Sequence, residues 1–414
     1  MSLIQDLRNP SKAQLGAHTW QLREKLGHMV VLAETVSPRV HSIMVTTGCD
    51  HGCRFCYLPS VPHGRGESIS LETIRKAIVT LGLYKSPVLT GGEPLDHPDI
   101  AAIVTATNGK IDFTNGFSTE IQPQRCVEIL NKVSNRIQAV SFSIHEKDAG
   151  SNPGRDIVLK HAVLTRPEPY TLKFLVEFGK GYEILDAWLD TLLTLVCDKQ
   201  IQSAMRENVS VSNHIAALPG IQLINFNPSP IAKVGRGLKL DGIYVGDEIS
   251  FIPEAFDSVD KIIGGSVLFP DGRLASLFLQ CSGQMTTNIF ATLDDAPDVQ
   301  KRALRSMLNE YLSEKLARSD EAFEREAHHY FEREFQLLNF LIEFLSTFRR
   351  PDIKKKLVEI KDAIAKAIGI PPKRCKTLVD RLSDRVIDEE IKKVAEGRST
   401  PPIVEFFLQN NVHL

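Results

Sequence analysis

Three cysteines close together are the residues of this chain best suited to do chemistry. Cys49, Cys53 and Cys56 lie in the run TGCDHGCRFCYLP, directly after an apolar stretch that is typical of a strand. Thiolates are soft ligands that select zinc, Cu(I) or iron–sulfur centres, and four ligands usually close a structural site. Three clustered cysteines are one ligand short, which suits an iron–sulfur cluster with one iron open to a substrate or cofactor. A zinc knuckle completed by His51 or by a distant residue, or three unrelated buried thiols, are the alternatives.

A second motif, Thr-Gly-Gly-Glu-Pro-Leu, occupies residues 90–95. Two successive glycines at the end of a strand let the backbone approach a ligand without interference from Cβ atoms, and their amides and carbonyls can pair with an extended polar group. An amino acid moiety would suit such an edge. A tight turn between a strand and a helix is the alternative explanation.

The elements that must position these motifs follow a repeating pattern between about residue 39 and residue 230. Short apolar runs alternate with amphipathic stretches, which is typical of βα units around a parallel sheet. Six strands are predicted, over residues 39–47, 86–92, 110–116, 139–145, 170–178 and 221–228. Six units predict an open barrel or a doubly wound sheet, with the active site at the carboxyl ends of the strands. The cysteines follow the first strand and therefore lie at that end.

Helices are predicted between the strands. The clearest covers residues 71–81, with Ser70 as its N-cap. A second is expected to begin at Pro98, in the first helical position, and to end at Asn108 and Gly109. Further helical patterns cover residues 123–133, 155–164 and 182–197.

Together these motifs resemble the radical S-adenosylmethionine (radical SAM) superfamily. The residues that carry the resemblance are the three cysteines, with Phe55 just before the last of them, and the Gly91-Gly92-Glu93-Pro94 turn about 35 residues later. The similarity extends to residues 114–116 at the third strand and to Ser143 at the fourth, so that it covers roughly residues 39–235.

The resemblance implies a partial (β/α)6 barrel in which Cys49, Cys53 and Cys56 ligate a [4Fe–4S] cluster. The fourth iron would be chelated by the amino and carboxylate groups of S-adenosylmethionine. The residues implied to contact this cofactor are Gly91, Gly92 and the backbone of Glu93 at the methionine amino group, Phe55 and the backbone near Tyr57 at the adenine, Ser143 at the ribose or methionyl end, and Arg155 near the carboxylate. Many relatives have Ser-x-Asp where this chain has Ser143-Ile144-His145.

The implied activity is that of a radical SAM oxidoreductase. An electron from an external donor of the flavodoxin or ferredoxin type would cleave S-adenosylmethionine, and the resulting 5′-deoxyadenosyl radical would abstract hydrogen from a small molecule or a peptide. The residues nominated to face that substrate are polar groups at the strand ends: His145, Lys173, Glu177, Asn225 and Asn227. The alternatives are a radical SAM enzyme that modifies nucleotides or RNA, and a non-catalytic metal-binding scaffold with a degenerate cluster site.

The chain outside the barrel is predicted to form three further parts. The predicted division is an N-terminal extension over residues 1–38, the barrel over 39–240, a hairpin or lid region over 241–297 and a helical C-terminal domain over 298–414. The hairpin should turn at residues 270–272. Only Cys281 lies in the region where some relatives carry additional clusters, so we expect a hairpin without metal. Glu326 and His329 have a spacing found in di-iron bundles, but no second pair accompanies them, which favours a solvated helix face.

Composition excludes several classes of protein. The 414 residues are 43% hydrophobic and 24% charged, with a formal net charge of −2, which gives no electrostatic signature for nucleic acid or a membrane surface. The first thirty residues lack the apolar core of a signal peptide, and no apolar run reaches the roughly 20 residues that span a bilayer. Scattered cysteines outside the cluster do not form a disulfide framework. A cytoplasmic protein without nucleic-acid or membrane partners is expected.

Overall fold

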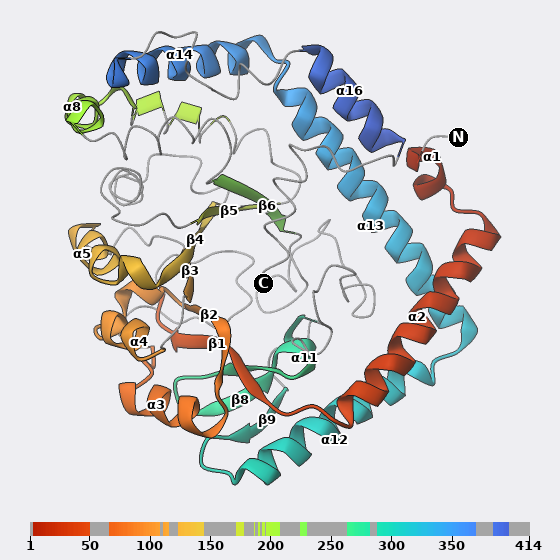
Figure 1. The fold of residues 1–414 in the computed structure, drawn as a ribbon. Coiled ribbons are helices and arrows are strands. Elements are labelled where there is room, and N and C mark those ends of the chain that lie inside the picture. The colour runs from red at the N-terminus through yellow and green to blue at the C-terminus, as the bar shows by residue number, and fades with distance from the viewer. Residues whose placement is uncertain are drawn as a thin grey trace.

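The fold was analysed in a computed structural model. It describes residues 3–49, 66–107, 111–115, 123–144, 171–177, 196–207, 224–229, 263–281, 288–369 and 384–396, together with residues 186, 189–190 and 193–194. A sheet runs through the middle of the molecule (Figure 1). Short helices lie on one side of this sheet, and a long arc of helices lies on the other.

The described strands form one open sheet in the order β6-β5-β4-β3-β2-β1-β7-β8-β9. Its first six strands run parallel and follow one another in chain order, as repeated βα units require. They are β1 (Arg39–Thr46), β2 (Leu83–Gly91), β3 (Ile111–Asn115), β4 (Ile137–Ile144), β5 (Thr171–Glu177) and β6 (Ile224–Ser229). The prediction of six parallel strands is confirmed. Strands β6 and β9 are the two ends of the described sheet, so it does not close into a barrel.

The hairpin extends this same sheet at its β1 edge. It consists of β7 (Gly265–Leu268), which runs parallel to β1, and the antiparallel strand β8 (Arg273–Ser276), and β9 (Ile289–Thr292) follows in the antiparallel sense. The predicted turn is confirmed: Gly272 donates its amide to the carbonyl of Phe269 at 3.0 Å and has φ +84°, a conformation that favours glycine.

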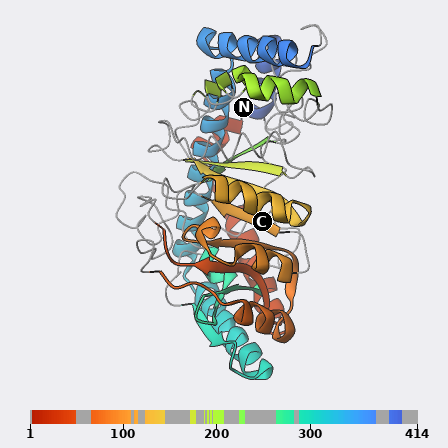
Figure 2. The same ribbon diagram turned by 90° about the vertical axis from the view of Figure 1, so that its left-hand side faces the viewer.

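Helices α3 (Leu71–Thr80), α4 (Ile100–Ala106) and α5 (Pro123–Val133) lie along one side of the sheet (Figures 1 and 2). Helices α3 and α5 agree with the predictions. The described helix α8 (Lys199–Glu207) was not predicted, residues 155–164 lie outside the described part of the chain, and the predicted helix over 182–197 is helical wherever it is described.

Helix α4 begins two residues later than predicted. A single 3-10 turn, η1 (Pro94–Asp96), precedes it, and His97 has the extended conformation that a residue before proline prefers. Asp99, not His97, is therefore the N-cap residue. Its predicted end at residues 108–109 lies outside the described residues.

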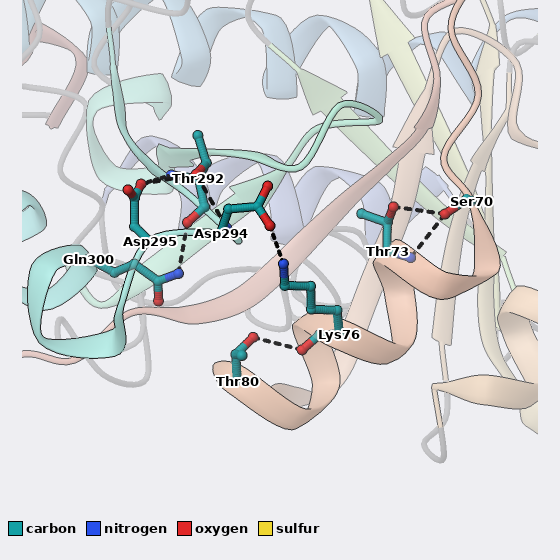
Figure 3. Close-up of polar contacts among 8 residues, drawn as sticks. All are labelled: Ser70, Thr73, Lys76, Thr80, Thr292, Asp294, Asp295 and Gln300. Atoms are coloured by element: carbon teal, nitrogen blue, oxygen red, sulfur yellow. Dashed lines mark hydrogen bonds and ion pairs between the residues drawn. The ribbon is translucent and has the colours of Figure 1, made fainter.

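Polar contacts tie α3 to the segment that follows β9 (Figure 3). Ser70 accepts a hydrogen bond from the Thr73 amide at 3.0 Å, which confirms it as the N-cap of α3. Further along this helix, Lys76 forms an ion pair with Asp294. The parallel strands with their helices and the hairpin region are thus joined through side chains as well as through the sheet.

Long helices beyond β9 confirm the predicted helical C-terminal region. The short helix α11 (Leu277–Cys281) and the 3-10 turn η2 (Ser134–Arg136) lie elsewhere in the fold. The long C-terminal helices are α12 (Pro297–Leu316), α13 (Asp320–Thr347), α14 (Pro351–Ile368) and α16 (Asp384–Ala395). They form an arc from β9, at one end of the sheet, to α8 near the other end (Figure 1). None of the described helices is both long enough and apolar enough to cross a membrane.

The N-terminal extension adds two helices that were not predicted, α1 (Leu3–Arg8) and α2 (Lys12–Ala33). Ser11 and Gln14 form a capping box at the start of α2. Its buried side chains recur every three or four residues, and Leu22, Leu26 and Met29 share a core with α12 and α13. The extension is therefore part of the helical arc.

Candidate cofactor site

The two motifs meet where β1 and β2 end. Thr46, the last residue of β1, lies opposite Gly91, the last residue of β2. The Gly92 amide donates to the Thr46 carbonyl at 2.6 Å, and the Glu93 amide donates to the Gly48 carbonyl at 3.0 Å. The segment that leads into the first cysteine and the Gly-Gly turn are thus bonded directly to each other, as the carboxyl ends of neighbouring parallel strands allow.

Both glycines of this turn are required by close packing. Gly91 has φ +135°, and a Cβ atom there would lie 2.3 Å from the Thr46 carbonyl oxygen. A Cβ atom at Gly92 would lie 1.9 Å from the Gly48 carbonyl oxygen and 3.0 Å from the Cβ atom of Cys49. No side chain fits between the two segments. The turn therefore presents bare backbone immediately beside the half-buried Cys49.

Hydrogen bonds hold the chain on both sides of the segment that carries the cysteines. Beyond Cys49, the described chain resumes at Gly66, and residues 66–69 return beside the end of β1. The Thr47 amide donates to the Glu67 carbonyl, and the Glu67 amide donates to the Thr47 hydroxyl, both at 2.9 Å. We call residues 66–69 the return segment. Residues 50–65, which include Cys53, Phe55, Cys56 and Tyr57, lie outside the described residues.

Glu93 and His97 are buried beneath the turn. The Glu93 side chain is fully buried and accepts a hydrogen bond from the Leu95 amide at 3.4 Å, which caps the η1 turn. The His97 ring is 2% exposed and bonds to the Ile69 carbonyl at 2.8 Å. The sequence predicted a role for the backbone of Glu93 and none for His97. A histidine directly before a proline, soon after a strand-end turn, was the available signal.

The other predicted site residues divide between described and undescribed parts of the chain. Ser143 lies on β4, and Lys173, Glu177, Asn225 and Asn227 lie on β5 and β6. Ser143 is paired with Leu175, Lys173 with Asn225, and Leu175 with Asn227. Residues paired in this way share a face, so that the register places these polar positions on one face of the sheet. Val140 alternates with them on β4 and belongs to the core shared with the helices. Arg155 and His145 lie outside the described residues.

Comparison with known families identifies this region. Residues 43–148 match the family model of the radical SAM superfamily. This part of the chain is a radical SAM domain. The matched range contains the three cysteines, the Gly91-Gly92-Glu93 turn and Ser143, and it ends before Arg155. The resemblance drawn from the cysteine spacing and the glycine turn is thereby confirmed.

Two solved structures are similar to this chain at low identity. Streptococcus suis SuiB bound to precursor peptide SuiA is 14% identical, with a TM-score of 0.39, over 64% of this chain and 65% of that one. SuiB bound to S-adenosylmethionine is 13% identical, with a TM-score of 0.36, over 58% and 60%. The chain thus spans less than two thirds of the SuiB chain. No curated protein matches this sequence at a significant level.

The described residues fit the cofactors that the radical SAM superfamily uses, a [4Fe–4S] cluster and S-adenosylmethionine. A thiol at the end of β1 stands beside a turn from which side chains are excluded, so that a ligand bound at Cys49 would meet peptide groups. Cys126, by contrast, is fully buried, and burial raises the pKa of its thiol far above its usual value. It therefore stays a protonated thiol, which is a poor ligand. Among the described residues, which include only Cys49 of the three clustered cysteines, no group of three or more His, Cys, Asp or Glu is placed to hold a metal.

Proposed function

We propose that this chain is a radical SAM enzyme. Its task is to bind a [4Fe–4S] cluster through Cys49, Cys53 and Cys56 and to hold S-adenosylmethionine against the Gly91-Gly92 turn. The observation that carries this proposal is the direct hydrogen bonding of the Cys49 segment to that turn inside a radical SAM domain. When bound, the cluster and S-adenosylmethionine would supply a 5′-deoxyadenosyl radical that takes hydrogen from the substrate.

The turn suits the amino group of methionine for a chemical reason. An ammonium group only donates hydrogen bonds and therefore needs acceptors. The amides of Gly92 and Glu93 already donate to Thr46 and Gly48, so the groups of matching chemistry in the turn are its carbonyl oxygens. Around this anchor we assign the adenine to Phe55 and the backbone near Tyr57, the ribose or methionyl end to Ser143, and the carboxylate to Arg155.

We place the substrate against the polar face of β4–β6, between the sheet and the helical arc. Lys173, Glu177, Asn225 and Asn227 occupy that face and can hydrogen-bond a small molecule or a peptide. The reducing electron would come from a separate protein of the flavodoxin or ferredoxin type. The division of the chain at about residues 38, 240 and 297 is part of this proposal.

Anaerobic reconstitution tests this function. The purified chain is incubated with iron and sulfide, then with S-adenosylmethionine and dithionite, and 5′-deoxyadenosine is measured by chromatography. We expect a broad iron–sulfur absorbance and the appearance of 5′-deoxyadenosine. A chain that forms no cluster, or a cluster that releases no 5′-deoxyadenosine, would contradict the proposal and favour a metal-binding scaffold.

Three cysteine variants locate the cluster. Cys53→Ala should abolish cluster formation, because it removes one of three ligands. Cys126→Ala should bind as much iron as the wild type, because that thiol is buried in the core, and Cys197→Ala, at an exposed position, controls for the loss of a surface thiol. Equal iron loss from all three variants would overturn the ligand assignment.

A further inference from the structure

His97 uses both nitrogens of its ring in the folded protein. The Asp99 amide lies 3.0 Å from Nδ1, and the Ile69 carbonyl lies 2.8 Å from Nε2. A backbone amide only donates, so Nδ1 accepts, and Nε2 therefore carries the proton that it donates to Ile69. The two bonds define the tautomer and the direction of the ring.

The bond to Ile69 reaches the return segment of the cysteine region. Ile69 donates its own amide to the Val45 carbonyl of β1 at 2.9 Å. At the other end of this segment, Gly66 lies so close to Gly48 that a Cβ atom would be 2.2 Å from the Gly48 nitrogen. His97 thus holds a strand-like segment against the end of β1, on the side away from β2.

The backbone around His97 leads directly to the Gly-Gly turn. The His97 amide donates to the Pro94 carbonyl at 3.2 Å, and the Asp96 amide donates to the Glu93 carbonyl at 3.0 Å. The His97 carbonyl in turn accepts a hydrogen bond from Arg125 of α5 at 3.1 Å. The η1 turn therefore connects the histidine directly to the backbone amides that bond to Thr46 and Gly48.

These contacts form a closed circuit around the end of β1. One arm runs from β1 through the Gly92 and Glu93 amides and η1 to His97, and the other runs from β1 through Ile69 to the same ring. We propose that His97 is a positioning residue, which keeps the Gly91-Gly92 turn and the return segment in a common register on either side of Cys49. The link to cluster binding rests on the proposed function, whereas the hydrogen bonds of His97 do not depend on it.

Two conservative variants separate the two bonds of the ring. His97→Asn places an amide oxygen where Nδ1 was and keeps the acceptor for Asp99, but it is too short to reach Ile69. His97→Gln places an amide nitrogen where Nε2 was and keeps the donor to Ile69. If His97 acts through the return segment, only the asparagine variant should release it. His18→Asn is the matched control, because His18 is also a buried histidine and stacks on Tyr330 of α13 at 3.9 Å.

Amide hydrogen exchange in the metal-free protein provides the first measurement. In His97→Asn we expect residues 66–69 and 92–93 to exchange at least about tenfold faster than in the wild type, since a buried carbonyl loses its donor. In His97→Gln and His18→Asn the same residues should stay within about threefold of the wild type. An unchanged return segment in His97→Asn, or faster exchange spread evenly over the whole chain, would overturn the proposal.

Cluster retention provides the second measurement. After reconstitution, the half-life of the cluster against an iron chelator should shorten by about tenfold in His97→Asn and stay near the wild-type value in His97→Gln. Equal half-lives in the two variants would remove the link to the cysteine segment. If the wild type assembles no cluster, the proposed function fails, while the exchange measurement still decides whether His97 joins the two segments.

Discussion

Gly92 shows how closely single residues constrain this site. Its α-carbon faces the Gly48 carbonyl and the Cβ atom of Cys49, and both neighbours belong to the segment that carries the first cysteine. Since the nearest atoms are backbone atoms of Gly48, they cannot rotate away as the end of a side chain can. The identity of residue 92 is therefore linked to the position of Cys49.

We expect Gly92→Ala to disrupt the site. A methyl group 1.9 Å from a carbonyl oxygen must push the two segments apart, at a cost of about 1–3 kcal/mol of unfolding free energy. Iron bound after reconstitution should fall well below the wild-type value. Gly27→Ala is the control: this glycine is inside α2 with no atom near its Cβ position, so the variant should gain about 0.5–1 kcal/mol in urea unfolding. Normal iron binding by Gly92→Ala would contradict the packing argument.

His97 predicts a pH dependence of stability. Burial lowers its pKa below the usual value of 6.5, with the Arg125 cation acting in the same direction, while the bond to Ile69 and the charge of Asp99 act against the shift. The unfolded chain therefore binds more protons as the pH falls below about 6.5, and the folded state loses stability until the pH drops below the folded pKa. Unfolding free energies measured in urea between pH 7.5 and 5 should show this loss in the wild type. His97→Gln should show a smaller loss, and identical slopes would refute the assignment.

The junction between β9 and α12 illustrates how the elements are joined (Figure 3). Asp295 accepts hydrogen bonds from the amide of Thr292 at 2.7 Å and from its hydroxyl at 3.0 Å, and buried Gln300 of α12 donates to the Thr292 carbonyl at 2.8 Å. The neighbouring Asp294 has an 88% exposed side chain, and its partner Lys76 is 42% exposed. Adjacent aspartates thus make a local cap and a solvent-screened ion pair.

We expect the two aspartates to differ in their contribution to stability. Asp295→Ala should lower the unfolding free energy by about 1–2 kcal/mol, because the Thr292 amide and hydroxyl lose their acceptor. Asp294→Ala should change it by less than about 0.5 kcal/mol, since exposed ion pairs contribute little. Chemical denaturation of both variants at low and high salt is the measurement. A larger loss for Asp294→Ala would show that the cross-link to α3 matters more than the cap.

At the scale of the whole molecule, the long N-terminal helix α2 packs against α12 and α13 of the helical arc. Leu26 of α2 is 1% exposed and lies in one apolar cluster with Leu308 of α12 and Phe323 of α13. Arg23 adds an ion pair to Asp320 and lies over the Phe323 ring, 4.3 Å from its centroid. The N-terminal extension therefore stabilises the helical arc opposite the sheet.

Leu26→Ala should destabilise the molecule by about 2–5 kcal/mol, the usual cost of removing a buried leucine side chain. Trp20→Ala, on the same helix, should have a small effect because Trp20 is 62% exposed. Hydrogen exchange should locate the loss in α12 and α13. If both variants unfold at the same urea concentration, α2 does not support the arc.

Most of the strand pattern could be predicted because its signal is local. The parallel strands appear in the sequence as apolar runs, and the N-cap serine of α3 lies beside its helix in sequence. The start of α4 was misplaced because Pro98 fits a helix start equally well in isolation. What excluded it was the preceding η1 turn, which contacts β1, β2 and β3. Helices α1 and α2 were missed although Ser11 and the spacing of Leu15, Leu22 and Leu26 carried a signal.

The three clustered cysteines, their spacing and a glycine turn at the next strand were enough to indicate a radical SAM domain. These features are local, since ligand type and backbone freedom belong to individual residues. The three-dimensional arrangement was needed to see that the Gly92 and Glu93 amides bond to Thr46 and Gly48, that His97 bonds to Ile69, and that α2 packs on α12 and α13. Contacts between residues far apart in the chain depend on the register of the sheet, which no short stretch of sequence specifies.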